Sequence, residues 1–212
     1  MKMRDEEEWR YVIIATNMEV LDEWYRTLQE RLPAGAIGRQ APDFYLHDHS
    51  KVDLGRTTKV GKETPEFDDR VKFTWLPRVD GRNYVTFYNK HVVDHISGNS
   101  FFIRSKSNPS VFWYAEDHKI LAGQQGRTRF RITGRDLDRS AVMINGDAIS
   151  ITPVHDWNLS VCVQQNGDLG LERRSHDFKL ADLKNGFLST GLGFEARVTK
   201  VNYDGEEWEL VS

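Results

Sequence analysis

The stretch FFIRSKSNPSVFWYAEDHKILAGQQGRTRFRI, Phe101–Ile132, contains the pattern of four short strands together with the turns between them. Three runs of apolar and aromatic residues are separated by polar or glycine-containing segments that favour turns. In the fourth run, Phe130 and Ile132 alternate with Arg129 and Arg131, which is the period of a strand with one buried and one solvated face. We therefore expect a four-strand unit here.

The chain after this stretch repeats the pattern more loosely. The aromatic-x-aliphatic ending Phe130–Ile132 returns as Phe178–Leu180 and as Trp208–Leu210. Residues two apart project to the same side of a strand, so each triplet can place two anchors in a common core while its middle charge stays in water. The Asn-Gly-Asp segments 145–147 and 166–168 supply hairpin turns between further short apolar runs. The sequence predicts an all-β domain of about a dozen short strands with no helix among them.

Three units that each end in an aromatic-x-aliphatic strand resemble the β-trefoil superfamily, the fold of ricin-B-type lectins, fascins, and mushroom trefoil lectins and protease inhibitors. The resemblance covers residues 69–212 and implies a mainly β fold, a trefoil-like barrel that binds its ligand through loops. The Gln-x-Trp form typical of ricin-B repeats is absent from this sequence. No sugar-site residue is therefore transferred from that family by motif.

Residues 1–68 are expected to form an N-terminal strand-helix extension followed by an irregular arm. Trp9–Ala15 predicts a buried strand, Thr16 or Asn17 then caps a helix with one apolar stripe, and Pro33 ends it. This strand and helix resemble the last strand and the C-terminal helix of pleckstrin-homology domains. We interpret them as a unit that packs on the main domain and not as a lipid-binding module.

The segment 34–69 has scattered glycines, prolines and charges, with one candidate strand at Phe44–Asp48. A segment of this length without clear periodicity is typical of a functional loop or a wrapping arm. After it, Val71–Leu76 and Tyr84–Tyr88 predict a hairpin, because Asp80-Gly81 between them supplies turn chemistry.

Composition narrows the classes of partner. The net charge of −3 provides no basic footprint, so we expect neither a nucleic-acid nor a membrane partner. Arginines 127, 129, 131 and 135 are explained by an exposed strand face. Cys162 is the single cysteine, so a disulfide within the chain is excluded and a reducing compartment is favoured. Because its neighbours are apolar, we expect its thiol to be buried and to behave as a small hydrophobic group. Without a signal peptide or a membrane-spanning run, a cytoplasmic protein is expected, unless it leaves the cell by an unconventional route.

The His47-Asp48-His49 segment is the sharpest metal-like feature. On a strand, the two histidines would point the same way, and His91 with His95 would complete a divalent site if the fold brought them near. Because the surrounding segment is poorly patterned, the simpler interpretation is an exposed polar loop. We expect no cofactor.

Two groups of residues have the character of ligand-binding sites. His155, Asp156, Trp157 and Asn158 form a polar loop around one large aromatic, so a sugar could stack on the indole while the carboxylate and amide bind its hydroxyls. The alternatives are that Asn158 is an ordinary turn residue and that Trp157 covers the core.

Trp113, Tyr114 and Asp117 form the second group. Neighbours on a strand point in opposite directions, so Phe112, Trp113 and Tyr114 cannot all face one core, and one or two of them are expected to be exposed or covered by the N-terminal extension.

The sequence contains no nucleophile elbow, P-loop, dinucleotide-binding glycine pattern or paired-histidine helix. We therefore expect a non-enzymatic, lectin-like binding protein, with carbohydrate as the leading ligand and a protein surface second. One alternative is a protease inhibitor of trefoil type acting through the Ser105–Ser110 loop. Another is an enzyme using the His47 and His49 region or a pocket between the arm and the barrel.

Overall fold

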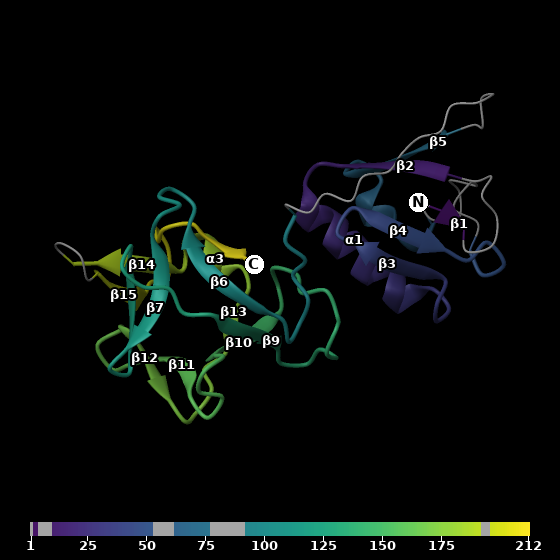
Figure 1. Cartoon of the computed structure of the whole chain (residues 1–212). Coiled ribbons are helices and arrows are strands. Elements are labelled where there is room, and N and C mark those ends of the chain that lie inside the picture. Colours follow the sequence, from purple (N-terminus) through teal and green to yellow (C-terminus); the bar gives the residue numbers. More distant parts are fainter. Residues whose placement is uncertain (1, 4–9, 53–61, 77–91, 192–195) are drawn as a thin grey trace. The chain divides into compact units, whose positions relative to one another are not determined.

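The computed structural model describes residues 2–3, 10–52, 62–76, 92–191 and 196–212 of the chain (Figure 1). The protein is mainly β and divides into two compact units, unit 1 (Met1–Asp94) and unit 2 (His95–Ser212). The division falls after Asp94, whereas we expected it after residue 68. The difference arises because strand β5 (Val71–Leu76) pairs along its whole length with β2 (Arg10–Ala15) and so belongs to the sheet of unit 1.

The described part of unit 1 contains one mixed sheet. Its strand order is β3 (Ile37–Ala41), β4 (Phe44–His47), β1 (Lys2–Met3), β2 and β5, and β1 with β4 is the parallel pair. The short helix η1 (Pro65–Phe67) precedes β5. The expected strand at 44–48 is confirmed as β4, and β3 adds a strand inside the segment we expected to be irregular. The expected partner of β5, residues 84–88, lies outside the described residues.

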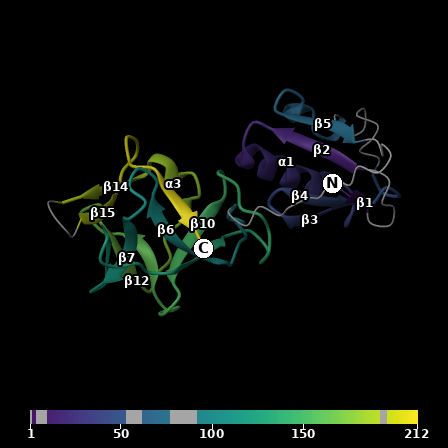
Figure 2. The same ribbon diagram turned by 45° about the horizontal axis from the view of Figure 1, so that its top comes forward.

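Helix α1 (Met18–Arg31) packs on this sheet (Figure 2). Asn17 caps it, because its side-chain oxygen accepts a hydrogen bond from the Val20 backbone N–H at 2.9 Å. The Trp24 ring anchors the buried face, with its centroid 5.3 Å from that of Phe73 and 5.9 Å from that of Tyr45. The predicted helix and its apolar stripe are confirmed. Neither α1 nor the shorter helix of unit 2, among the helices described, has the length and apolar character to cross a membrane.

Unit 2 consists of short antiparallel strands that form one curled sheet in its described part. Their bounds are β6 (Ser100–Ser105), β7 (Phe112–Glu116), β8 (Lys119–Gly123), β9 (Phe130–Gly134), β10 (Ala148–Pro153), β11 (Ser160–Val163), β12 (Leu169–Glu172), β13 (Phe178–Lys179), β14 (Phe187–Thr190), β15 (Ala196–Lys200) and β16 (Trp208–Val211). The four-residue helix α3 (Asp182–Asn185) lies between β13 and β14, where we expected no helix. The four strands predicted within residues 101–132 are present as β6 to β9.

The core of unit 2 is built from the repeated triplets. Phe130, Phe178 and Trp208 are all buried, and so are the aliphatic residues two positions after each of them. This confirms the prediction that the aromatic residue of each triplet is a core anchor. The exposure alternates along β9, because one face of the strand packs inward and the other meets water.

Candidate functional site

The loop between β10 and β11 carries the first predicted site, His155–Asn158. Asp156 accepts a hydrogen bond from the Asn158 backbone N–H at 3.1 Å, and the Leu159 N–H donates to the Asp156 carbonyl at 3.3 Å. These bonds define a compact Asx turn. The Trp157 side chain projects from this turn with 76% of its surface exposed, so it is not a lid over the core.

The base of this loop is joined to the neighbouring strand. The Val154 N–H donates to the Arg129 carbonyl at 2.9 Å, which extends the pairing of β9 with β10 by one residue. The Val154 side chain is 45% exposed and adds apolar surface next to the loop. The arrangement therefore presents an aromatic plate, an adjoining aliphatic side chain and a carboxylate on one fixed turn.

The second predicted group does not form an exposed site. Trp113 is fully buried, with its ring centroid 5.0 Å from that of Phe187 and 5.6 Å from that of Trp208. Tyr114 faces the other way but is buried too, because the backbone at Gly126 lies against its ring, where a Cβ atom would stand 2.9 Å from Cγ. The structure thus places both aromatic rings in packing roles, and Phe112 is half-buried.

Asp117 lies apart from those two rings, at the exposed tip of the β7–β8 hairpin. Asp117 and His118 have φ values of 46° and 59° between the paired residues Glu116 and Lys119. Two successive residues with positive φ define a tight turn of the kind that matches the twist of a hairpin. The conformation of Asp117 is therefore explained by the turn.

The two histidines of the 47–49 segment have different environments. Strand β4 ends at His47, which is buried with its ring edge-on to Tyr11 at 6.1 Å, whereas His49 follows in an exposed turn. The strand alternation that would align them does not continue past His47. Among the described residues no group of three or more histidine, cysteine or acidic side chains is arranged to hold a metal. His91 lies outside those residues, and His95 packs its ring against Phe101 in unit 2.

Cys162 lies inside unit 2, as predicted. Its Sγ donates a hydrogen bond to the Gly170 carbonyl at 3.5 Å, and burial raises the pKa of the thiol to about 11. A thiol with this pKa stays protonated at neutral pH, which fits the role of a small buried hydrophobe.

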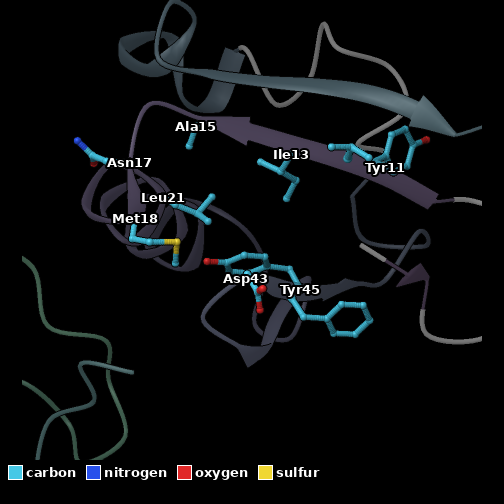
Figure 3. Close-up of a pocket in the computed structure, with 10 residues that line it drawn as sticks. Tyr11, Ile13, Ala15, Asn17, Met18, Leu21, Asp43 and Tyr45 are labelled. Carbon is cyan, nitrogen blue, oxygen red and sulfur yellow. The ribbon is translucent and has the colours of Figure 1, made fainter. Parts of the chain in front are cut away.

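Unit 1 contains a pocket that the sequence did not predict (Figure 3). Its volume is about 430 Å³, and it lies between β2, the first turn of α1 and the β3–β4 turn. Tyr11, Ile13 and Ala15 line it from one face of β2, and Met18 and Leu21 line it from α1. This volume falls in the lower part of the range for small-molecule sites, and the lining suits an apolar group.

The pocket lies along the part of β2 that follows Arg10. Among the described residues, β1 pairs with β2 at Lys2 and Arg10, and the β2 residues that line the pocket follow that point in the chain. The period-2 alternation of Tyr11, Ile13 and Ala15 was visible in the sequence.

A buried charge cluster in unit 1 was also missed by sequence reasoning. The Arg39 guanidinium lies 3.0 Å from a carboxylate oxygen of Asp22 and 3.0 Å from one of Asp94. Burial raises the pKa of Asp22 to about 7, and the Arg39 charge opposes this rise. The cluster links α1, β3 and the end of unit 1, so we assign it a structural role.

Comparisons of the chain with protein-family models, curated proteins and solved structures return no match.

Proposed function

We propose that unit 2 is a β-trefoil domain that binds carbohydrate without catalysis. A repeated pairing scheme supports the fold. In the first repeat β6 pairs with β9 and encloses the hairpin β7–β8, and in the second β10 pairs with β13 and encloses β11–β12. In the third, Phe187 in β14 bridges to Glu206, shortly before β16, and the chain between them contains the β14–β15 pair.

The links between repeats support the same fold. The last strand of the first repeat, β9, pairs with the first strand of the second, β10. The last strand of the chain, β16, pairs with β6, the first strand of the first repeat. Pairing of the end of a sheet with its beginning removes open edges, which is the physical advantage of a closed β architecture.

The exposed indole of Trp157 is the observation that carries the carbohydrate proposal. A large aromatic side chain that leaves 76% of its surface in water contributes little to folding, so its position fits a binding role better than a core role. An indole face suits the apolar face of a sugar ring. The Asp156 carboxylate adjoins it, and a carboxylate can accept several hydrogen bonds, so it retains capacity for hydroxyl groups after bonding to Asn158.

A second candidate function, protease inhibition, is favoured by the order of the β6–β7 loop. Ser105 Oγ accepts from the Asn108 backbone N–H at 3.2 Å, and Asn108 Oδ1 accepts from the Ser110 hydroxyl at 2.7 Å. Residues 106–110 are exposed. A loop held in one conformation by its own hydrogen bonds is preorganised for binding a protease cleft.

The test is a broad glycan array probed with the full chain, with Trp157→Ala and with Tyr203→Ala. Tyr203 is the matched control, because it is an equally exposed aromatic of unit 2, with 78% of its surface accessible. We expect glycan binding that is lost in Trp157→Ala and kept in Tyr203→Ala. Equal loss in both variants, or no bound glycan, would contradict the proposal. Inhibition of cysteine or serine proteases, abolished by Asn108→Ala, would instead support the second candidate.

A further inference from the structure

Unit 2 presents a row of three arginines, Arg127, Arg129 and Arg131, on the segment that pairs with the base of the Trp157 loop. We infer that this row, together with Trp157, selects an anionic glycan, one that carries sulfate or carboxylate groups. The inference rests on the proposed function and adds the chemical class of the ligand.

The row is produced by alternating burial along residues 127–132, which enter β9 at Phe130. Thr128, Phe130 and Ile132 are buried, so the three arginines between and before them point outward and are exposed. Alternate residues of an extended chain lie roughly 7 Å apart, so the backbone positions of the three arginines follow one another along one side of the segment. Such a line can contact successive charged groups of an extended ligand.

Phe102 of β6 positions two of these side chains. The guanidinium carbon of Arg127 lies 4.9 Å from the centroid of the Phe102 ring, and that of Arg129 lies 5.1 Å from it. Stacking on an aromatic face restricts a guanidinium without neutralising its charge. Both groups are therefore held in place with their hydrogen-bond donors available to an anion.

Several other arginines of unit 2 have carboxylate partners. Arg104 pairs with Glu209 at 2.6 Å, Arg197 pairs with Asp168 at 2.9 Å, and Arg135 pairs with Asp177. Among the described residues, no carboxylate lies within ion-pair distance of the three arginines of the row. A row of arginines without carboxylate partners forms a positively charged strip, which attracts an anion.

The register of the sheet joins this row to the loop with Trp157. Arg131 is paired with Thr152 across β9 and β10, and the Arg129 carbonyl accepts from the Val154 N–H. Trp157 follows Val154 by three residues on the turn described above. The row and the loop of Trp157 therefore adjoin at the base of that loop, where β9 pairs with β10.

A guanidinium binds sulfate, carboxylate and phosphate groups through paired hydrogen bonds, so its chemistry alone does not separate a glycan from a nucleic acid. Two observations favour the glycan. The net charge of the chain is −3, which opposes a long polyanion, and the row is short. The neighbouring exposed indole supplies the plate that a sugar ring requires.

The test measures binding of the full chain to a heparin-type sulfated oligosaccharide, to its desulfated counterpart and to a single-stranded oligonucleotide of similar charge. The variants are Arg129→Gln, Trp157→Ala and the control Arg173→Gln, an exposed arginine on the connection after β12. We expect the sulfated glycan to bind at least tenfold more tightly than the desulfated one, and binding to weaken with salt. Arg129→Gln should reduce the affinity about tenfold, whereas Arg173→Gln should not change it.

The outcomes separate this inference from the proposed function. Glycan binding that requires Trp157 but is equal for sulfated and desulfated forms would overturn the inference and leave the proposed function standing. Binding of the sulfated form that survives Trp157→Ala would contradict a shared site. Oligonucleotide binding as tight as that of the sulfated glycan, and sensitive to Arg129→Gln, would point to nucleic acid and overturn the inference. Absence of all glycan binding would overturn both.

Discussion

The Asp22 carboxylate and the Arg39 guanidinium lie 3.0 Å apart inside unit 1, with 10% and 4% of their side chains exposed. Asp22 comes from α1 and Arg39 from β3, so this ion pair joins the helix to the sheet. Arg39 also contacts Asp94, which ties the end of unit 1 to the same position. Removal of one partner from a buried pair leaves an uncompensated charge, and this is far more costly than loss of an exposed pair.

Arg39→Met should therefore lower the free energy of unfolding of unit 1 by about 3–5 kcal/mol. The measurement is urea denaturation followed by circular dichroism, analysed with separate transitions for the two units. Arg31→Met is the control, because the Arg31 and Glu66 side chains, 2.7 Å apart, are 44% and 40% exposed, and loss of such a pair should cost less than about 1 kcal/mol. A similar loss in the two variants would contradict the structural role of the buried pair.

The stability of unit 1 should fall as the pH rises from about 4 to about 7. Burial raises the pKa of Asp22 from 3.8 to about 7. Because this folded-state pKa lies above that of the unfolded chain, the native state binds an additional proton in this window and is stabilised most at its acidic end. Asp22→Asn should remove this contribution. Urea midpoints measured across the window would show a flatter profile for the variant, and parallel profiles would contradict the assignment.

Trp113→Ala and Trp157→Ala should have opposite signatures. Trp113 is fully buried against Phe187 and Trp208, so its truncation should cost about 3–5 kcal/mol of stability in unit 2. Trp157 is exposed, and its truncation should change stability by less than about 0.5 kcal/mol. Thermal unfolding of both variants tests this. A large loss in Trp157→Ala would show that the indole packs in the fold, and any effect on binding would then be indirect.

The tip of the β7–β8 hairpin offers a stabilising substitution. His118 has a φ of 59°, a region that costs a residue with a Cβ atom roughly 1 kcal/mol and that glycine adopts freely. His118→Gly should therefore raise the stability of unit 2 by up to about 1 kcal/mol, measured as an increased melting temperature. Asp147→Gly, in a turn where Asp147 accepts a hydrogen bond from the Ile144 N–H, should instead lower it. Destabilisation by His118→Gly would mean that the side chain contributes contacts outweighing the backbone strain.

Local patterns in the sequence were sufficient to predict the elements of unit 2 whose structure depends on residues adjacent in the chain. The alternation of apolar and charged residues predicted the strand that the structure shows as β9, Phe130–Gly134. The core positions of Phe130, Phe178 and Trp208 were predicted from their triplets. The loop around Trp157 was also predictable, because its members are adjacent in the chain and its turn is closed by a side chain two residues away.

Pairing partners were not predictable in the same way. The strand at Val71–Leu76 was predicted with its observed bounds, yet its partner is β2, and the expected partner lies outside the described residues. One or two of Phe112, Trp113 and Tyr114 were expected to be exposed or covered by the N-terminal extension, but the backbone at Gly126 covers the tyrosine. Burial of one side chain depends on segments that are not its neighbours in the chain.

The sequence by itself determined the mainly β character of unit 2, its repeated core triplets, the helix α1 and the loop of Trp157, because strand alternation, helix capping and turn chemistry act over a few residues. Only the tertiary structure decided which strands pair. Strand pairing in turn fixes the stacking of Arg129 on Phe102 and the hydrogen bond from the Val154 N–H to the Arg129 carbonyl. The burial of Arg39 between two carboxylates was likewise decided by the tertiary structure. These contacts link distant segments, and their formation depends on the burial and pairing of whole strands, which no local pattern records.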